Sequence, residues 1–83
     1  MIIERFRNGP APVYARFHER GRLAPSELHY INSWLSEDMS TCYQVMECVN
    51  RKYLEQWMTA WQDLVDFEVI PVMESKVAAS KFA

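Results

Sequence analysis

Residues 28–48 constrain the fold more than any other stretch, because they predict two strands joined by a short polar loop. Aromatic and β-branched residues, which suit strands, lie on both sides of the loop. The loop itself, residues 36–40, has the length and polarity of a longer hairpin connection. The rest of the chain is therefore expected to pack around this hairpin.

The register of the hairpin decides which side chains share a face, because side chains alternate across a sheet. We expect Trp34 to lie opposite Cys42. A mixed aromatic, sulfur and amide face then consists of Leu28, Tyr30, Asn32, Trp34, Cys42, Gln44 and Met46. The opposite face, mostly apolar and suited to covering helices, consists of Ile31, Ser33, Leu35, Tyr43 and Val45. The mixed face suits a subunit interface or a ligand cleft.

Two helices and two further strands are predicted outside the hairpin. Residues 1–7 predict a strand, and a helix follows the turn at residues 8–10 and ends near Gly21. Residues 51–64 carry a wide apolar stripe at helical spacing, with Asn50 as N-cap. Residues 66–73 predict a last strand that ends or lies at an edge, because Pro71 has no N–H for a ladder.

This order, β-α-β-β-α-β, predicts an α+β, ferredoxin-like domain over residues 1–73. Such a domain has a four-stranded antiparallel sheet with two helices on one face. The uncovered face would expose Tyr30, Trp34 and Met46, and a second copy of the sheet is the expected cover. Residues 74–83 form a C-terminal tail, for which a short helix, a frayed end and a partner-bound segment all remain open.

Composition narrows the classes of partner. The formal net charge is −2 and no basic stripe is present, so neither nucleic acid nor an anionic membrane is an expected partner. Glu4 and Arg5 interrupt the apolar start, and no apolar run approaches membrane-spanning length. We therefore expect a cytoplasmic protein.

Several segments together resemble a known family. IERF, PVYARF, GRLAP, YINSW, CYQVMEC and DLVDFEVIPV are similar, in order and spacing, to an uncharacterised bacterial family of the dimeric α+β barrel group. The resemblance spans residues 1–72. It implies a homodimer in which two ferredoxin-like sheets pack face to face, with a cleft either between helices and sheet or between the two sheets, and it implies no reaction. Distant members of that group include cofactor-free monooxygenases, muconolactone-type isomerases and haem-degrading enzymes, which offer analogy at the level of the fold alone.

Glu4 is the candidate catalytic residue. It lies on the same side of the first strand as Phe6, and burial in a cleft beside Trp34 and Met46 would raise the pKa of its carboxyl and suit it to act as a general base. The alternative is a structural ion pair with Arg5, Arg7 or Arg16, or simple exposure near the end of the strand.

The candidate ligand-binding residues come from the mixed face of the hairpin. Amide and indole groups there can orient a carbonyl or hydroxyl group, and a tyrosine can donate a proton or shape a pocket. The alternative is that these side chains fill a subunit interface. The set is Tyr30, Asn32, Trp34, Gln44 and Met46.

No metal and no cofactor are expected. His18 and His29 have no second ligand at metal-binding spacing, and residues 51–64 lack the histidine that a haem-degrading enzyme would use. Cys42 and Cys48, six positions apart on one strand, would be separated by roughly 20 Å and are expected to be reduced thiols. The leading hypothesis is a homodimer with a cleft for a small organic ligand, with cofactor-free monooxygenase- or isomerase-like catalysis. The alternative is a non-catalytic binding or structural dimer module.

Overall fold

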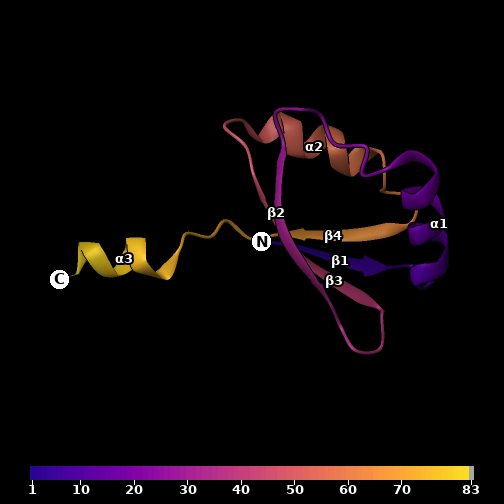
Figure 1. Cartoon of the computed structure of the whole chain (residues 1–83), viewed down its shortest axis with the longest axis horizontal. Coiled ribbons are helices and arrows are strands. Elements are labelled where there is room, and N and C mark those ends of the chain that lie inside the picture. The colour runs from indigo at the N-terminus through magenta and orange to yellow at the C-terminus, as the bar shows by residue number, and fades with distance from the viewer. Residues whose placement is uncertain (83) are drawn as a thin grey trace.

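The computed structural model describes residues 1–82 and contains one four-stranded sheet and three helices (Figure 1). In chain order the elements are β1 (Ile2–Phe6), α1 (Pro10–Arg20), β2 (His29–Leu35), β3 (Thr41–Glu47), α2 (Arg51–Thr59), β4 (Val65–Val69) and α3 (Ser75–Lys81). The predicted order β-α-β-β-α-β is confirmed, with α3 added after it.

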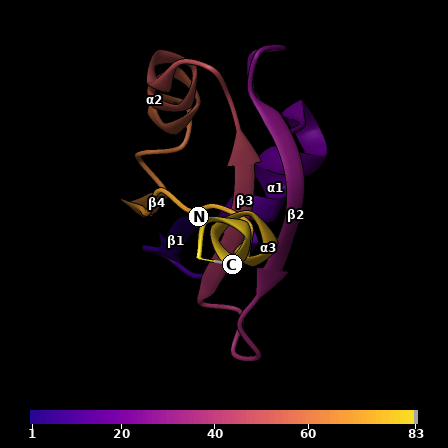
Figure 2. The same cartoon turned by 90° about the vertical axis from the view of Figure 1, so that its left-hand side faces the viewer.

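The sheet has the strand order β2-β3-β1-β4, and every neighbouring pair is antiparallel. Helices α1 and α2 both lie on one face of it, and no element of residues 1–82 covers the other face (Figure 2). This is the ferredoxin-like α+β arrangement. The core between α2 and the sheet is built on Ile2, Leu28, Leu54, Trp57, Trp61 and Val65.

Strand β1 separates the two faces as its sequence predicts. Ile2 and Glu4 are buried under the helices, whereas Arg5 is exposed on the outer face. There Arg5 pairs with Glu68 of β4 at 3.0 Å. The central strand therefore carries its one carboxylate into the layer between sheet and helices.

The expected hairpin register is wrong along most of its length. Tyr30 does lie opposite Met46, but a β-bulge at Ile31 shifts the rest of β2 by one residue, so Trp34 lies opposite Tyr43 and not opposite Cys42. A bulge inserts one unpaired residue and so exchanges the two faces of a strand beyond it. In consequence Ser33 and Leu35 face the helices, and the outer face receives Trp34, Asn32, Tyr43 and Val45.

Helix α2 is shorter than the apolar stripe predicts. It ends at Thr59, and residues 60–64 form turns in which the N–H groups of Leu64 and Val65 both donate to the Trp61 carbonyl. Val65, which directly follows the predicted helical stripe, pairs with Phe6 as the first residue of β4. Pairing with β1 overrides the helical period, because the backbone of β4 must be extended to join the sheet.

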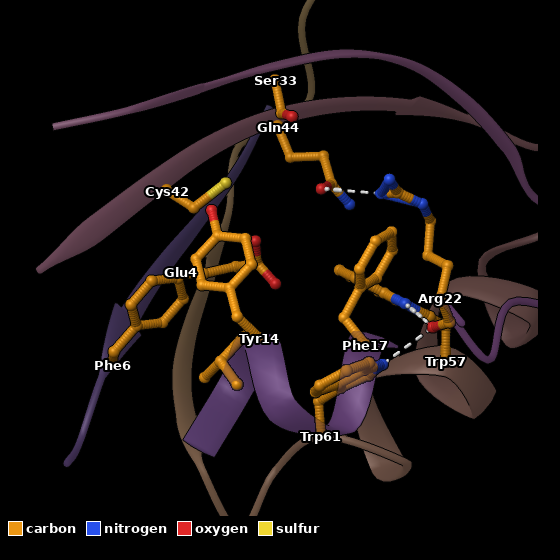
Figure 3. A pocket seen from close by; sticks show the side chains of 11 residues that line it. Glu4, Phe6, Tyr14, Phe17, Arg22, Ser33, Cys42, Gln44, Trp57 and Trp61 are labelled. Carbon is orange, nitrogen blue, oxygen red and sulfur yellow. Dashed lines mark hydrogen bonds between the residues drawn. The ribbon is translucent and has the colours of Figure 1, made fainter. Parts of the chain in front are cut away.

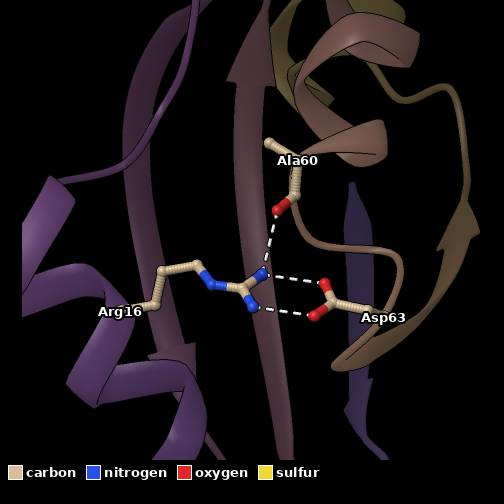
Figure 4. A network of polar contacts seen from close by, with 3 residues as sticks. All are labelled: Arg16, Ala60 and Asp63. Carbon is tan, nitrogen blue, oxygen red and sulfur yellow. Dashed lines mark hydrogen bonds and ion pairs between the residues drawn. The ribbon is translucent and has the colours of Figure 1, made fainter.

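A polar clamp joins α1 to the turn after α2 (Figure 4). The Arg16 guanidinium donates to both oxygens of Asp63, at 2.8 and 2.7 Å, and to the Ala60 carbonyl at 3.0 Å. Helix α1 has no buried residue, so this clamp is a principal tie between that helix and the rest of the domain.

The C-terminal tail forms a short helix that projects away from the sheet and the other helices (Figure 1). None of the residues of α3 is buried, and the Phe82 side chain that follows it is 89% exposed. Of the alternatives that the sequence left open for the tail, the structure contains the short helix.

Candidate functional site

A cavity of about 110 Å³ lies between the inner face of the sheet and the two covering helices (Figure 3). Apolar and aromatic side chains supply most of its wall, and a few polar groups point into it. The lining residues are Glu4, Phe6, Val13, Tyr14, Phe17, Arg22, Ser33, Cys42, Gln44, Trp57 and Trp61. This composition is typical of small-molecule sites.

Glu4 supplies the carboxylate of the cavity. Its side chain is only 7% exposed, and its strand partner Cys42 lies beside it on β3. Burial raises the pKa of Glu4 above its ordinary value of 4.5, and a hydrogen bond from Cys42 and the positive charge of Arg22 oppose that rise without cancelling it. The arginines proposed as alternative partners of Glu4 pair elsewhere, with Glu68, Asp66 and Asp63.

Two weaker acids surround the carboxyl group. Burial, followed by the neighbouring charge of Glu4, raises the pKa of Cys42 to about 12, so this thiol remains protonated and acts as a donor. Burial is also the largest reason for the raised pKa of Tyr14, with Cys42 and Glu4 adding to it. The Tyr14 hydroxyl points toward the Cys42 sulfur, so this end of the cavity holds three titratable groups (Figure 3).

The other polar end of the cavity is formed by Arg22 and Gln44. The guanidinium Nη1 of Arg22 donates to Gln44 Oε1 at 3.4 Å, and the Gln44 amide in turn donates to Met46 Sδ at 3.0 Å. Gln44 is 4% exposed. The Arg22 guanidinium lies over the Tyr30 ring, 3.7 Å from its centroid, which is a close cation–π contact. A cation is thereby held at the opposite end from Glu4.

The structure divides the predicted site residues between two faces. Glu4 and Gln44 line the cavity, Met46 supports Gln44, and Tyr30 supports Arg22. Asn32 and Trp34 lie on the outer face, beyond the bulge, and do not line this cavity. The picture of Glu4 beside Trp34 is therefore corrected: its neighbours are Cys42 and the residues of α1 and α2.

Most of the residues that line the cavity were not predicted as site residues, among them Tyr14, Phe17 and Arg22. Tyr14 and Phe17 lie in the helix that was predicted to end near Gly21 and were not considered for the site, although a tyrosine in that helix was a signal for a polar group directed at the sheet. Arg22 lies in the loop after α1, where no periodic pattern assigns an orientation. It was not considered for the site.

The side chains and helices of residues 1–82 are relevant to metal binding and to membrane insertion. No group of three or more His, Cys, Asp or Glu residues in this part of the chain has a geometry that could hold a metal ion. No helix in it has both the length and the apolar character needed to cross a membrane. Both cysteines are free; Cys42 is buried and Cys48 partly buried, as expected.

Comparison with known proteins gives a family and no activity. The family model described as "Domain of unknown function (DUF3303)" matches residues 1–83, the whole chain. No curated protein and no solved structure matches the chain.

Proposed function

The chain belongs to the DUF3303 family, a domain of unknown function, and we propose that its inner cavity binds a small organic molecule with which Glu4 exchanges a proton. The observation that carries the proposal is the placement of Glu4. Glu4 is only 7% exposed and lines the wall of a cavity, and no ion pair within residues 1–82 neutralises its carboxylate. Burying such a group has a free-energy cost, and functional sites are where that cost is most often found.

Proton transfer from carbon is the chemistry that this arrangement supports. In its ionised form the Glu4 carboxylate can accept a proton from a carbon next to a carbonyl group, and its raised pKa brings its basicity closer to that required. Return of the proton to another carbon would complete an isomerisation. A cofactor-free oxygenation of the same carbanion would begin with the same step. Cys42 is unsuited to be a nucleophile, because its pKa is about 12.

The size of the cavity limits the ligand. At about 110 Å³ it is smaller than the cavity of about 150 Å³ that accepts benzene. We therefore expect a short-chain carbonyl compound with its apolar part against the aromatic wall. Phe17 and Trp57 are two residues of that wall.

The proposal is tested by hydrogen–deuterium exchange at carbon. Wild type is incubated in D₂O with 2-oxobutyrate, 4-oxopentanoate and 2-butanone, and loss of the signals of protons next to the carbonyl is followed by proton NMR. We expect exchange above the buffer rate with at least one compound. We expect its loss in Glu4→Gln and its retention in Glu37→Gln, a matched change at an exposed glutamate of the hairpin loop. Exchange no faster than buffer in all three, or exchange unaffected by Glu4→Gln, would contradict the proposal.

We further propose that the protein is a homodimer formed through the outer face of the sheet. Trp34 and Tyr43 lie opposite each other on that face and are 55% and 40% exposed, and Ile3 and Val45 adjoin them. An antiparallel sheet that faces water on one side normally carries polar residues there. A second copy would cover these aromatic side chains without requiring another partner.

The oligomeric state tests this second proposal directly. Sedimentation velocity on wild type should give a dimer at micromolar concentration, and Trp34→Ser should shift it to a monomer that retains the wild-type circular dichroism spectrum. A wild-type monomer at all accessible concentrations would refute the homodimer while leaving the inner cavity intact.

A further inference from the structure

Arg22 has an unusually constrained backbone for a loop residue. It lies between Gly21 and Leu23, which both have positive φ, at 72° and 61°. A positive φ at Leu23 is unfavourable for a residue with a side chain, so surrounding contacts must hold it there. Those contacts are visible: the Arg22 carbonyl accepts a hydrogen bond from Trp57 Nε1 at 3.1 Å and from Trp61 Nε1 at 2.9 Å (Figure 3).

The side chain of Arg22 is held by aromatic contacts and forms no ion pair with any acidic residue within residues 1–82. Its guanidinium lies 3.7 Å from the centroid of Tyr30 and 5.3 Å from that of Phe17. Within residues 1–82 no ion pair involves Arg22, whereas Arg5, Arg7 and Arg16 each contact a carboxylate at 3.0 Å or less.

The hydrogen-bonding capacity of this guanidinium is largely unused. A guanidinium has five N–H donors in a planar fork, and the only side-chain acceptor for them within residues 1–82 is Gln44 Oε1, at the long distance of 3.4 Å. The residue is half-buried, so an anion bound to it would be partly shielded from water. Planar, bidentate pairing is the mode in which arginine binds a carboxylate.

We infer that the cavity is specific for a small organic monocarboxylate, with Arg22 binding the carboxylate and the rest of the ligand extending toward Glu4. This inference rests on the proposed function, because it names the class of molecule that the same cavity would take. A monoanion fits better than a dianion, because Arg22 is the single cation that lines the cavity, and the ionised carboxylate of Glu4 repels further negative charge. The aromatic wall between the two polar ends suits a short apolar body.

The test compares crotonate with crotonamide, which share a carbon skeleton and differ in charge. Isothermal titration of wild type should show crotonate binding at least about tenfold more tightly, as expected when a charged hydrogen bond is replaced by a neutral one. Arg22→Gln should abolish the difference, and Arg22→Lys should retain part of it. Arg20→Gln removes the same charge from an exposed site two residues away and should leave the preference unchanged. Thermal unfolding of each variant confirms that it is folded.

Equal binding of crotonate and crotonamide by wild type would overturn the inference without recourse to any variant. An undiminished preference in folded Arg22→Gln would overturn it as well. In both cases the proposed function would stand if Glu4-dependent deuterium exchange were observed with 2-butanone, which has no carboxylate. Absence of crotonate binding would likewise reject the carboxylate class, and the exchange experiment alone would then decide the proposed function.

Discussion

Glu4→Gln should make the protein more stable at neutral pH and should remove a specific pH dependence of stability. Burial raises the pKa of Glu4 in the folded state above 4.5, so the folded protein binds this proton more tightly than the unfolded chain does. The stabilisation is therefore complete below pH 4.5 and is lost as pH rises through the folded-state pKa. A single proton limits the loss to about 1.4 kcal/mol per pH unit between the two pKa values. Glutamine has nearly the same shape and no charge, so it does not incur this loss.

Urea unfolding followed by tryptophan fluorescence, at intervals between pH 4 and pH 8, measures the effect. The difference in unfolding free energy between Glu4→Gln and wild type should be small at pH 4, rise with pH and then level off. Titrations of all other groups cancel in that difference, and Glu37→Gln at the exposed loop should give a flat line. A difference that is independent of pH, or one that favours wild type as pH rises, would refute the burial argument.

Three further predictions concern the surroundings of the site. Arg16→Ala should speed amide hydrogen exchange throughout α1, because it removes the clamp to the turn after α2. Arg20→Ala should not, since the contact of Arg20 to Glu19 is 4.0 Å long and exposed. Equal protection of α1 in the two variants would contradict the clamp. Native protein treated with a thiol reagent at pH 8 should be modified only at Cys48, because Cys42 is buried and has a pKa of about 12. Rapid modification of both cysteines would argue against the burial of Cys42. Met39→Gly should raise the free energy of unfolding by about 1 kcal/mol, because Met39 has a φ of 63° in an exposed loop. If denaturant unfolding shows a lower free energy of unfolding instead, the Met39 side chain contributes to the stability of the loop.

Local patterns predict much of this fold. The alternation in β1 correctly places Ile2 and Glu4 on one face, because every residue of that strand is paired in regular register. Asn50 caps α2 as predicted, with its side chain accepting from the Lys52 N–H. The five residues between β2 and β3 form the hairpin loop, in which Asp38 accepts hydrogen bonds from the Ser36 and Ser40 hydroxyls. These features depend on near neighbours in the sequence.

The other features of the fold and of the candidate site depend on contacts between residues that are distant in the sequence. The bulge at Ile31 cannot be recognised from the alternation of side chains in the sequence, yet it moves Trp34 to the outer face and Ser33 to the cavity. The end of α2 is likewise decided by the pairing of Val65 with Phe6, which the helical period does not contain. Arg22 is positioned by two indoles more than thirty residues away in the chain, so its place in the site follows from the assembled fold alone.

The three tryptophans allow the location of the binding site to be measured directly. Trp57 and Trp61 lie at the wall of the inner cavity, whereas Trp34 lies on the outer face of the sheet, so their indole N–H signals report on different surfaces. In proton–nitrogen NMR spectra recorded during titration with 2-oxobutyrate and with 2-butanone, ligand binding should shift the signals of Trp57 and Trp61 and leave that of Trp34 in place. A saturable shift confined to Trp34 would contradict the account, because it would place the ligand on the face opposite to Glu4.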